Sequence, residues 1–393
     1  MLGVLSRRLG DLDRAADALQ EAVAEALRRW PEDGTPEHPA GWLVTTAWRR
    51  AIDTLRRDAT GREKLAQLAA EPEPSPTDDD RLALLFACCH PDLPVPYQIA
   101  LTLYAVSGLS TQEVAAAFLV PTATMAQRLV RAKRQLREHG VRFDQPPAEE
   151  YPERLTPVLS VIYLLFNEGY LATSARPTTA EPRPGDAVRS QRRQLATEAL
   201  ELARQLATLM PGEPEVAGLA ALLELHEARA ATRFDSWGRL VLLEDQDRRR
   251  WDHEAIAGAA ARLKAAVARN RPGPYQVQAG IAAQHALAPS APDTDWVAIR
   301  ALYDRLQALA PSPVVLLSRA VATHRAVGAT AALAEIEPLA GQLDGYRLFH
   351  ATRAELLRAL GREAEAREAT GRALALATNP AERDLLARRL RPR

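Results

Sequence analysis

The sequence predicts an all-α protein, with two small helical modules joined by a linker and followed by a helical-repeat region. Alanine, leucine, arginine and glutamate dominate its 393 residues, while aromatic residues make up 5%, a mixture that favours helix at most surface positions. Apolar residues also recur at helical spacing along most of the chain. Hydrophobic residues at 47% and charged residues at 25% exclude a wholly disordered or collagen-like chain.

The first module, residues 1–65, reads as two helices. The apolar stripe of its first helix is Ala15, Leu19, Val23, Ala26 and Leu27. We expect Pro31 to end that helix and a loop from Pro31 to Pro39 to follow. The apolar side of the second helix is Trp42, Leu43, Ala47, Ile52 and Leu55. The stretch from Arg49 to Lys64 contains six basic and three acidic residues, so this helix should carry a basic surface.

Residues 66–80 should be an acidic, proline-rich tether. The run from Glu71 to Asp80 holds three prolines and five acids without a base. Proline interrupts helices and like charges repel, so this run should be extended.

The second module, residues 81–140, carries a helix-turn-helix pattern. Ser110 and Glu113 have capping-box spacing at the start of a short helix. A turn from Leu119 to Pro121 follows, and Thr122 is expected to cap the next helix. That helix has an apolar face of Met125, Leu129, Ala132 and Leu136. Two short helices with a tight turn and a basic second helix favour a DNA-binding unit whose second helix enters the major groove.

The second helix of this motif offers polar side chains for bases and cations for phosphates. Thr124, Gln127 and Arg128, near its start, suit contacts with base edges. Farther along the helix, four cationic side chains could contact DNA phosphates: Arg131, Lys133, Arg134 and Arg137. A basic helix face that is merely solvated is the alternative, which the preceding capped helix and tight turn make weaker.

Other sequence features argue against an enzyme, a metal site and a membrane protein. The adjacent Cys88 and Cys89 are expected to be buried packing residues, because neighbouring positions on a helix point apart and no second ligand cluster follows. Glu244, Asp245 and Asp247 are the only close acid cluster that suggests a catalytic site, and Asp245 and Asp247 are expected to cap or bridge helices instead. No cofactor is implied, and the chain lacks a signal peptide or a run of about 20 apolar residues, so we expect a cytoplasmic location.

The formal net charge of zero hides an uneven distribution. Residues 1–140 contain 17 basic and 19 acidic residues. The basic residues cluster on two helices, and the acidic ones cluster in the tether. A neutral total therefore does not exclude nucleic-acid binding.

Two segments carry a family resemblance. LSTQEVAAAFLVPTATMAQRLVRAKRQLRE, residues 109–138, resembles the helix-turn-helix of bacterial RNA polymerase sigma factors of the extracytoplasmic-function type, which reads the minus-thirty-five promoter element. DRAADALQEAVAEALRRW, residues 13–30, and PAGWLVTTAWRRAIDTLRR, residues 39–57, resemble the domain that reads and melts the minus-ten element. Compared with that family, the chain is expected to start inside the first helix of this domain.

The resemblance implies roles for residues of both modules. The minus-thirty-five element would be read by Thr122, Thr124, Gln127, Arg128, Arg131, Lys133 and Arg134. DNA at the minus-ten element would be held by Arg49, Arg50, Arg56 and Arg57, with Trp48 as the base-stacking candidate, because the spacing of Trp42 favours core packing. The loop from Pro31 to Pro39 would receive a flipped base. Core RNA polymerase would bind Asp17, Gln20 and Glu21. The acidic tether would be either a plain spacer or a segment kept off the template DNA by its charge.

The rest of the chain resembles one subgroup of the family. YLLFNEGYLAT from Tyr163, LVLLEDQDRRRWD from Leu240 and GPYQVQAGIAAQHA from Gly273 resemble a subgroup with a fused C-terminal helical domain related to tetratricopeptide repeats. Independently, residues 318–339 and 351–372 match at an offset of about 33 residues, with Gly328 over Gly361. We expect a connecting helix and linker over 141–190, including a break at 174–186, and a repeat domain over 191–393 that could bind a protein partner.

The predicted function is a sigma factor that directs core RNA polymerase to promoter DNA, with a regulatory C-terminal helical domain. A helix-turn-helix transcriptional regulator with a protein-binding sensor domain is the alternative. The presence of two separate modules joined by a tether favours the sigma factor.

Overall fold

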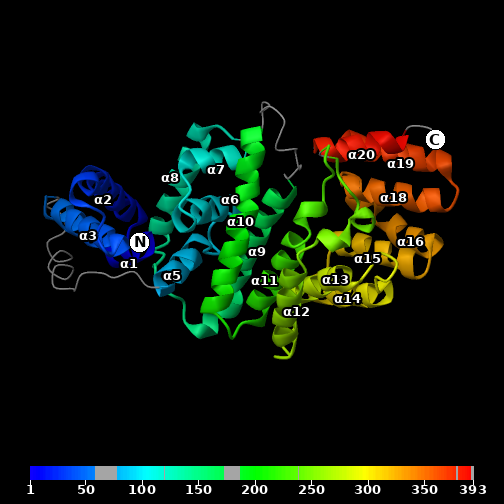
Figure 1. The fold of residues 1–393 in the computed structure, drawn as a ribbon, viewed down its shortest axis with the longest axis horizontal. Coiled ribbons are helices and arrows are strands. Elements are labelled where there is room, and N and C mark those ends of the chain that lie inside the picture. The colour runs from blue at the N-terminus through cyan, green and yellow to red at the C-terminus, as the bar shows by residue number, and fades with distance from the viewer. Residues whose placement is uncertain (58–77, 119, 172–185, 238, 378, 391–393) are drawn as a thin grey trace. The chain divides into compact units, whose positions relative to one another are not determined.

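A computed structural model describes residues 1–57, 78–118, 120–171, 186–237, 239–377 and 379–390 (Figure 1). In these ranges the regular elements are helices, apart from an isolated antiparallel bridge between Phe234 and Leu240. The predicted all-α fold is therefore confirmed. The chain divides into two compact units, Met1–Asn167 and Glu168–Arg393. None of the described helices is long and apolar enough to cross a membrane.

The first unit contains a three-helix group, a helix-turn-helix group and a long final helix. The elements are α1 (Leu2–Leu9), α2 (Leu12–Asp33), α3 (Pro39–Arg57), α5 (Asp78–Cys88), α6 (Val95–Leu101), the π-helical turn η1 (Thr102–Val106), α7 (Thr111–Ala117), α8 (Thr122–Glu138), the short 3₁₀ turn η2 (Ala148–Glu150) and α9 (Tyr151–Leu171). Most of the acidic tether and most of the predicted break at 174–186 lie outside the described residues.

Helices α1 and α2 meet at a tight turn that the sequence encodes locally. Gly10 ends α1 with a φ of 66°, a conformation that glycine adopts without strain. The Asp11 carboxylate then accepts hydrogen bonds from the backbone amides of Asp13 and Arg14, which caps α2. Pro31 does not end α2 as predicted. The helix continues to Asp33, because a proline in the last turn removes only one hydrogen bond.

The core of the three-helix group is built mainly from small residues. Its buried members are Val4, Leu5, Leu9, Ala15, Ala18, Ala22, Val44, Ala47, Trp48, Ala51 and Ile52. Alanines on α2 let α1 and α3 approach closely, so the larger Val23 and Leu27 do not join this core. They are 39% and 73% exposed, and their predicted place in the buried stripe is wrong.

The end of the acidic run is helical. Asp78, Asp79 and Asp80 form the first turn of α5, where carboxylates interact favourably with the helix dipole. Asp80 is 3% exposed and pairs with Arg7 of α1 at 2.8 Å. The prediction of an extended chain is therefore wrong for these three residues.

The helix-turn-helix forms with the predicted capping box. The backbone amide and hydroxyl of Ser110 donate to the Glu113 carboxylate at 2.8 and 2.7 Å, and the Glu113 amide donates back to the Ser110 hydroxyl at 3.2 Å. Thr122 is the first residue of α8 rather than its cap, because the helix begins directly after Pro121 and no side chain caps it. The predicted apolar face of α8 is buried, with Met125 fully so.

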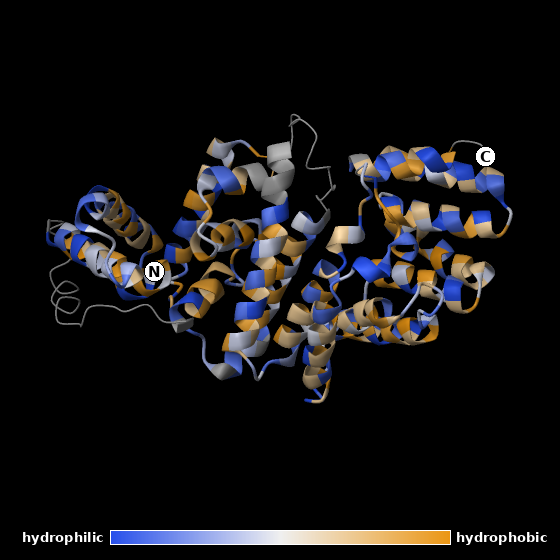
Figure 2. Cartoon of the chain, in the orientation of Figure 1, coloured by the Kyte–Doolittle hydropathy of each residue, from blue (hydrophilic) through white to orange (hydrophobic). Residues whose placement is uncertain are grey.

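The second unit is an array of helices (Figure 1), most of which carry both polar and apolar residues (Figure 2). The helices are α10 (Asp186–Leu209), α11 (Pro214–Glu227), α12 (His253–Val267), α13 (Pro274–Leu287), α14 (Trp296–Leu309), α15 (Pro313–Ala326), α16 (Ala329–Ile336), α17 (Ala340–Leu343), α18 (Arg347–Ala359), α19 (Glu363–Leu376) and α20 (Pro380–Leu390). Short 3₁₀ turns are η3 (Ala230–Thr232), η4 (Leu243–Asp245), η5 (Arg248–Arg250) and η6 (Glu337–Leu339).

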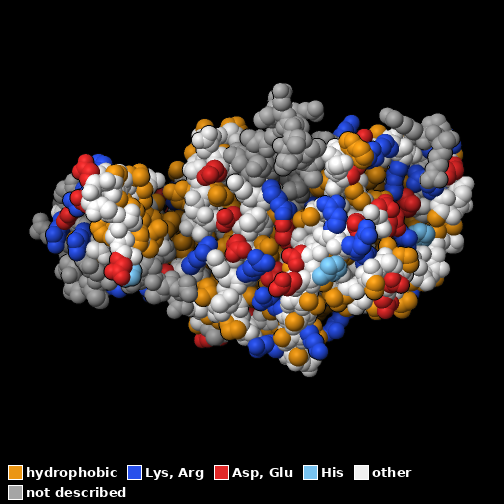
Figure 3. Space-filling view, viewed as in Figure 1, with side chains coloured by type: hydrophobic (Ala, Val, Ile, Leu, Met, Phe, Trp, Pro, Cys, Tyr) orange, Lys and Arg blue, Asp and Glu red, His pale blue; other side chains and the backbone are white. Residues whose placement is uncertain are grey.

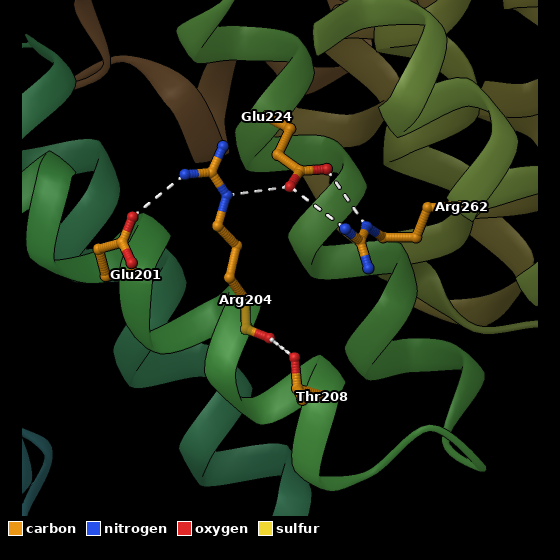
Figure 4. Close-up of polar contacts among 5 residues, drawn as sticks. All are labelled: Glu201, Arg204, Thr208, Glu224 and Arg262. Carbon is orange, nitrogen blue, oxygen red and sulfur yellow. Dashed lines mark hydrogen bonds and ion pairs between the residues drawn. The ribbon is translucent and has the colours of Figure 1, made fainter.

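Helix α11 is the most buried helix of its neighbourhood and packs against α10, α12 and α13. Its residues from Gly218 to Leu225 are all buried, as expected for a helix that is apolar on every side. At its buried Glu224, the carboxylate accepts hydrogen bonds from Arg204 of α10 and Arg262 of α12 at 3.1 and 3.3 Å (Figure 4). Arg204 also binds Glu201 on its own helix. One carboxylate thus ties three helices together.

Two helix pairs account for the internal sequence repeat. Pairs α15–α16 and α18–α19 lie antiparallel in the array (Figure 1), and both turn at the glycines that the alignment superposes. Gly328 has a φ of 136° and Gly361 a φ of 72°, values that favour glycine. The 33-residue offset therefore corresponds to a repeated helix–turn–helix, while its relation to tetratricopeptide repeats stays a prediction.

Candidate nucleic-acid interface

The second helix of the helix-turn-helix, α8, turns a polar face to solvent. Thr122, Thr124 and Gln127 are exposed near its start, and Arg128 is half-buried. Arg131 and Arg134 are exposed farther along, and Arg134 pairs with Glu138 on the same helix at 3.3 Å. These side chains lie opposite the buried apolar face, so they are available to a ligand in the position that a major groove would take.

Lys133 and Arg137 behave differently from the other cations of α8. The Lys133 ammonium lies 2.6 Å from Asp13 of α2 and 4.9 Å from the centre of the Tyr104 ring. Arg137 contacts the other oxygen of Asp13 at 2.5 Å. Burial acts to raise the pKa of Asp13, but hydrogen bonds from Lys133 and Arg137 outweigh it and lower that pKa. The predicted phosphate role of Lys133 therefore needs a conformation other than this one.

Both tryptophans of α3 are packed in the structure, whereas only Trp42 was predicted to pack. Trp48 is 5% exposed and belongs to the core of the three-helix group, so it cannot stack on a base in this conformation. Trp42 is half-buried and meets Trp30 of α2 edge to face, with ring centroids 5.5 Å apart. The loop between α2 and α3 is shorter than predicted, spanning residues 34–38.

The predicted minus-ten arginines lie along the exposed side of α3. Arg49 and Arg56 are exposed, and Arg56 contacts Asp53 at 3.5 Å. Arg50 binds Glu25 of α2 at 2.5 Å, and this hydrogen bond lowers the pKa of Glu25. The side chain of Arg57 lies outside the described residues.

The predicted polymerase-binding residues share one exposed side of α2. Asp17, Gln20 and Glu21 are exposed and lie within one turn of each other. The exposed Val23 and Leu27 extend this side toward the end of the helix. Sequence periodicity assigned these two residues to the core and so missed an exposed apolar patch, which suits protein contact.

The cysteines are buried as predicted. Cys88 and Cys89 are both fully buried, and the thiol of Cys89 lies 3.4 Å from the Thr102 hydroxyl. Burial raises the pKa of Cys89 to about 12. Among the described residues, no group of His, Cys, Asp and Glu has metal-site geometry.

In the second unit, the segment 228–252 joins α11 to α12. Three of its arginines donate hydrogen bonds to backbone carbonyls at the ends of three helices. Arg233 donates to the carbonyl of Tyr170 in α9 and lies over its ring. Arg248 donates to the carbonyls of His285 and Ala288 at the end of α13, at 2.6 and 2.7 Å. Arg229 donates to Leu225 of α11. Cations at helix C-termini are stabilised by the helix dipole, which makes this arginine-rich motif a packing element.

In the acid cluster within this segment, Asp247 caps a helical turn as predicted. It caps the turn η5 and binds Arg249 at 2.9 Å. Glu244 pairs with Arg325 of α15, so it bridges two parts of the unit.

A cavity of about 520 Å³ opens beside the same segment. Charged lining residues are Arg193, Arg204, Arg250, Glu224, Glu227 and Asp252, and the aromatic ones are Phe234 and Trp251. Both charge signs also alternate over the visible face of the second unit (Figure 3). This surface carries no uniform field that would attract a nucleic acid.

Comparison with known proteins finds two family matches in the N-terminal third of the chain. Residues 1–60 match the family described as "Sigma-70 region 2", and residues 83–136 match "Sigma-70, region 4". Residues 154–267 match a family of unknown function, DUF6596. No solved structure matches the chain.

Two relatives extend this result. "Uncharacterized protein R00370" of Rhizobium meliloti (strain 1021) is 45% identical over 395 residues, which cover 97% of this chain and 90% of that protein. "Probable ECF RNA polymerase sigma factor SigI" of Mycobacterium tuberculosis (strain ATCC 25618 / H37Rv) is 27% identical over 154 residues, or 36% of this chain and 52% of that protein. The chain therefore belongs to the same family as R00370, and its residues 1–60 and 83–136 are similar to regions 2 and 4 of sigma-70 factors.

Proposed function

We propose that the chain is a sigma factor of the extracytoplasmic-function type, in which α8 reads the minus-thirty-five element and α2 and α3 serve the minus-ten element and core RNA polymerase. One observation carries this proposal. Within the region 4 match, α8 buries its apolar face and exposes Thr124, Gln127 and Arg131 on the other. The likeness to SigI supports the extracytoplasmic-function type.

The side of α2 with Asp17, Gln20 and Glu21 is the proposed polymerase contact. Its acidic and amide groups stand beside exposed Val23 and Leu27, so it offers both charge and apolar area to a partner. Such a mixture is typical of protein interfaces. The exposed Arg49 and Arg56 on α3 would face the backbone of promoter DNA.

The assignment of α8 is tested by promoter-specific transcription with purified core polymerase. Arg131→Ala should reduce transcription from a cognate promoter about 10-fold or more, because a lost bidentate contact to a base or a lost phosphate contact costs about 1–3 kcal/mol. The matched control is Arg142→Ala, which removes a side chain that is 86% exposed just beyond α8. If Arg131→Ala and Arg142→Ala give equal activity, α8 is not the reading helix.

We further propose that the second unit regulates the sigma activity or supports it by binding another protein. Support comes from its separate compact fold and from its stacked helix pairs, an arrangement commonly used for protein binding.

This second proposal is tested by removing the unit. A chain ending at Gly185 keeps α1–α9, and we expect its transcription to differ from that of the full chain at least several-fold in either direction. Core polymerase binding by the shortened chain, measured in parallel, controls for folding. Equal transcription by the two chains, with and without cell extract, would refute a regulatory role.

A further inference from the structure

The cavity beside segment 228–252 has the size and the lining of a small-molecule site. Its volume of about 520 Å³ lies in the range of about 300–1,000 Å³ that is usual for ligand pockets. The lining comes from α10, the end of α11, the turn η3 and the start of α12, all within the second unit. Three arginines and three carboxylates contribute to it, so it is named the mixed-charge cavity.

The apolar lining of the mixed-charge cavity is aromatic and held in place. Trp251 is 4% exposed and Phe234 is 8% exposed. The indole Nε1 of Trp251 donates to the Thr232 hydroxyl at 2.8 Å, and the Arg248 guanidinium lies 4.7 Å from the centre of the indole ring. The other apolar lining residues are small: Ala228, Ala230, Ala231 and Ala255. Small side chains near fixed rings leave room for an apolar group of a ligand.

Four of the six charged lining residues belong to ion pairs. Arg193 of α10 pairs with Glu227 of α11, and Arg204 of α10 pairs with the buried Glu224. Arg204 uses its Nε for Glu224 and its Nη1 for Glu201. Its remaining nitrogen, Nη2, takes part in neither hydrogen bond and points away from both carboxylates (Figure 4). These pairs fix the frame of the cavity and leave one donor group over.

The other two charged lining residues have capacity left for a ligand. Arg250 and Asp252 are exposed and, within the described ranges, belong to no ion pair. They flank the buried Trp251 in the chain. One oxygen of Asp252 accepts a hydrogen bond from the backbone amide of Ala255 at 2.9 Å, which orients the carboxylate at the start of α12. The cavity therefore offers one cation and one anion beside an aromatic ring.

We propose that the mixed-charge cavity binds a small zwitterion with an aromatic side chain, the chemistry of a free aromatic amino acid. Arg250 and the Nη2 of Arg204 donate to the carboxylate, Asp252 accepts from the ammonium group, and the ring packs against Trp251 and Phe234. A ligand with only one charge would face a side chain of like charge, which is unfavourable. This inference concerns the second unit alone and does not depend on the proposed function.

The site is tested by titrating the full chain with L-phenylalanine and with L-tryptophan. The indole N–H resonance of Trp251, assigned with Trp251→Phe, reports binding at the cavity itself. Solvent screens the exposed Arg250 and Asp252, so we expect a saturable shift of this resonance with a Kd of about 0.1–1 mM for at least one of the two amino acids.

Analogues that lack one charge test the zwitterion. The acids 3-phenylpropionate and indole-3-propionate lack the ammonium group, and the amines 2-phenylethylamine and tryptamine lack the carboxylate. Each should bind about 10-fold more weakly than its parent amino acid, because it leaves a charged group of the cavity without a hydrogen-bond partner.

Two variants assign the two charges to their residues. Arg250→Gln should weaken amino-acid binding about 10-fold without weakening that of the amines. Asp252→Asn should weaken amino-acid binding to a similar extent without weakening that of the acids, and asparagine keeps the cap of α12. Arg249→Gln is the matched control, because the Arg249 side chain is 90% exposed, is bound by Asp247 and does not line the cavity. It should keep the affinity of the parent chain.

The proposal is refuted if neither amino acid gives a saturable shift of the Trp251 resonance up to about 10 mM. It is also refuted if the acids bind as tightly as the amino acids, or if Arg250→Gln and Arg249→Gln have equal affinity. Circular dichroism of each variant controls for folding. The titrations contain neither polymerase nor DNA, so their failure would leave the proposed sigma activity standing, and a chain without that activity could still show the site.

Discussion

At the scale of single residues, Glu224 shows how an arginine-rich unit holds charge inside its packing. The side chain of Glu224 is 9% exposed, while those of its partners Arg204 and Arg262 are 44% and 39% exposed. Solvent therefore screens part of each attraction. The buried carboxylate still separates two guanidinium groups that would otherwise face each other.

Glu224→Gln keeps the shape of the side chain and removes its charge. We expect a loss of about 1–2 kcal/mol in the stability of the second unit, because two half-buried cations lose their shared partner. Hydrogen exchange of the α11 amides should then be about 5–30 times less protected. Glu201→Gln is the control, since Glu201 is 52% exposed, and it should change protection by less than about threefold. Equal effects from the two variants would show that Glu224 is not central.

Residues also show where sequence periodicity fails. Trp42 and Trp48 stand six positions apart, and helical spacing did not predict that Trp48 belongs to the core. On α2, alanines at 15, 18 and 22 fill the core while Leu27 is exposed. Close approach of helices requires small side chains, so the largest apolar residues on a helix need not mark its buried side.

At the scale of elements, the segment 228–252 places Arg229, Arg233 and Arg248 close to two histidines of the neighbouring helices. His226 is half-buried beside Arg229, and its Nδ1 lies 2.9 Å from that guanidinium. Burial, together with Arg229, Arg233 and His285, lowers the pKa of His226 to about 3. Burial beside Arg229 and Arg248 lowers the pKa of His285 to about 4. Both rings are neutral in the folded unit at neutral pH.

This arrangement predicts acid sensitivity of the second unit. Between pH 6.5 and about 4 the unfolded chain binds protons at these histidines and the folded chain does not, so stability falls as the pH falls. Each histidine should contribute up to about 1.4 kcal/mol per pH unit in this window. The urea midpoint of α11 and α13, followed by pulsed hydrogen exchange at a fixed labelling pH, measures it.

The double variant His226→Gln, His285→Gln is the control for this prediction. It should remove most of the pH dependence of the midpoint, whatever its effect on stability at pH 7. An unchanged pH profile in the double variant would mean that other groups cause the acid sensitivity.

Helix starts and stops show how far elements follow from sequence. The capping box at Ser110 and Glu113 and the turn glycines Gly328 and Gly361 were predictable, because their chemistry is local. The end of α2 and the helical start of α5 were not. Both depend on what surrounds the helix end, as when Asp80 is stabilised by Arg7 from a helix about 70 residues earlier.

At the scale of the whole molecule, the sequence predicted the fold class, the helix-turn-helix and the similarity of two segments to sigma-70 regions 2 and 4. It did not predict that Asp13 would hold Lys133 and Arg137, because pairing between distant helices is set by the tertiary fold. The formal net charge of zero now has a structural counterpart in the first unit. Asp13 and Asp80 pair with basic residues from other helices of this unit. These ion pairs leave fewer unpaired positive charges on the surface of the free chain.

The π-helical turn at Thr102–Val106 limits which insertions and deletions this part of the chain can tolerate. A π-helical turn closes hydrogen bonds from i to i+5 and so takes in one more residue than an α-helical turn. Tyr104, which lies beneath Lys133, sits within this turn. Removal of one codon here would return the helix to regular α-helical register and rotate the following side chains by about 100°. The aromatic support under Lys133 thus depends on the length of the helix as much as on the identity of the residue.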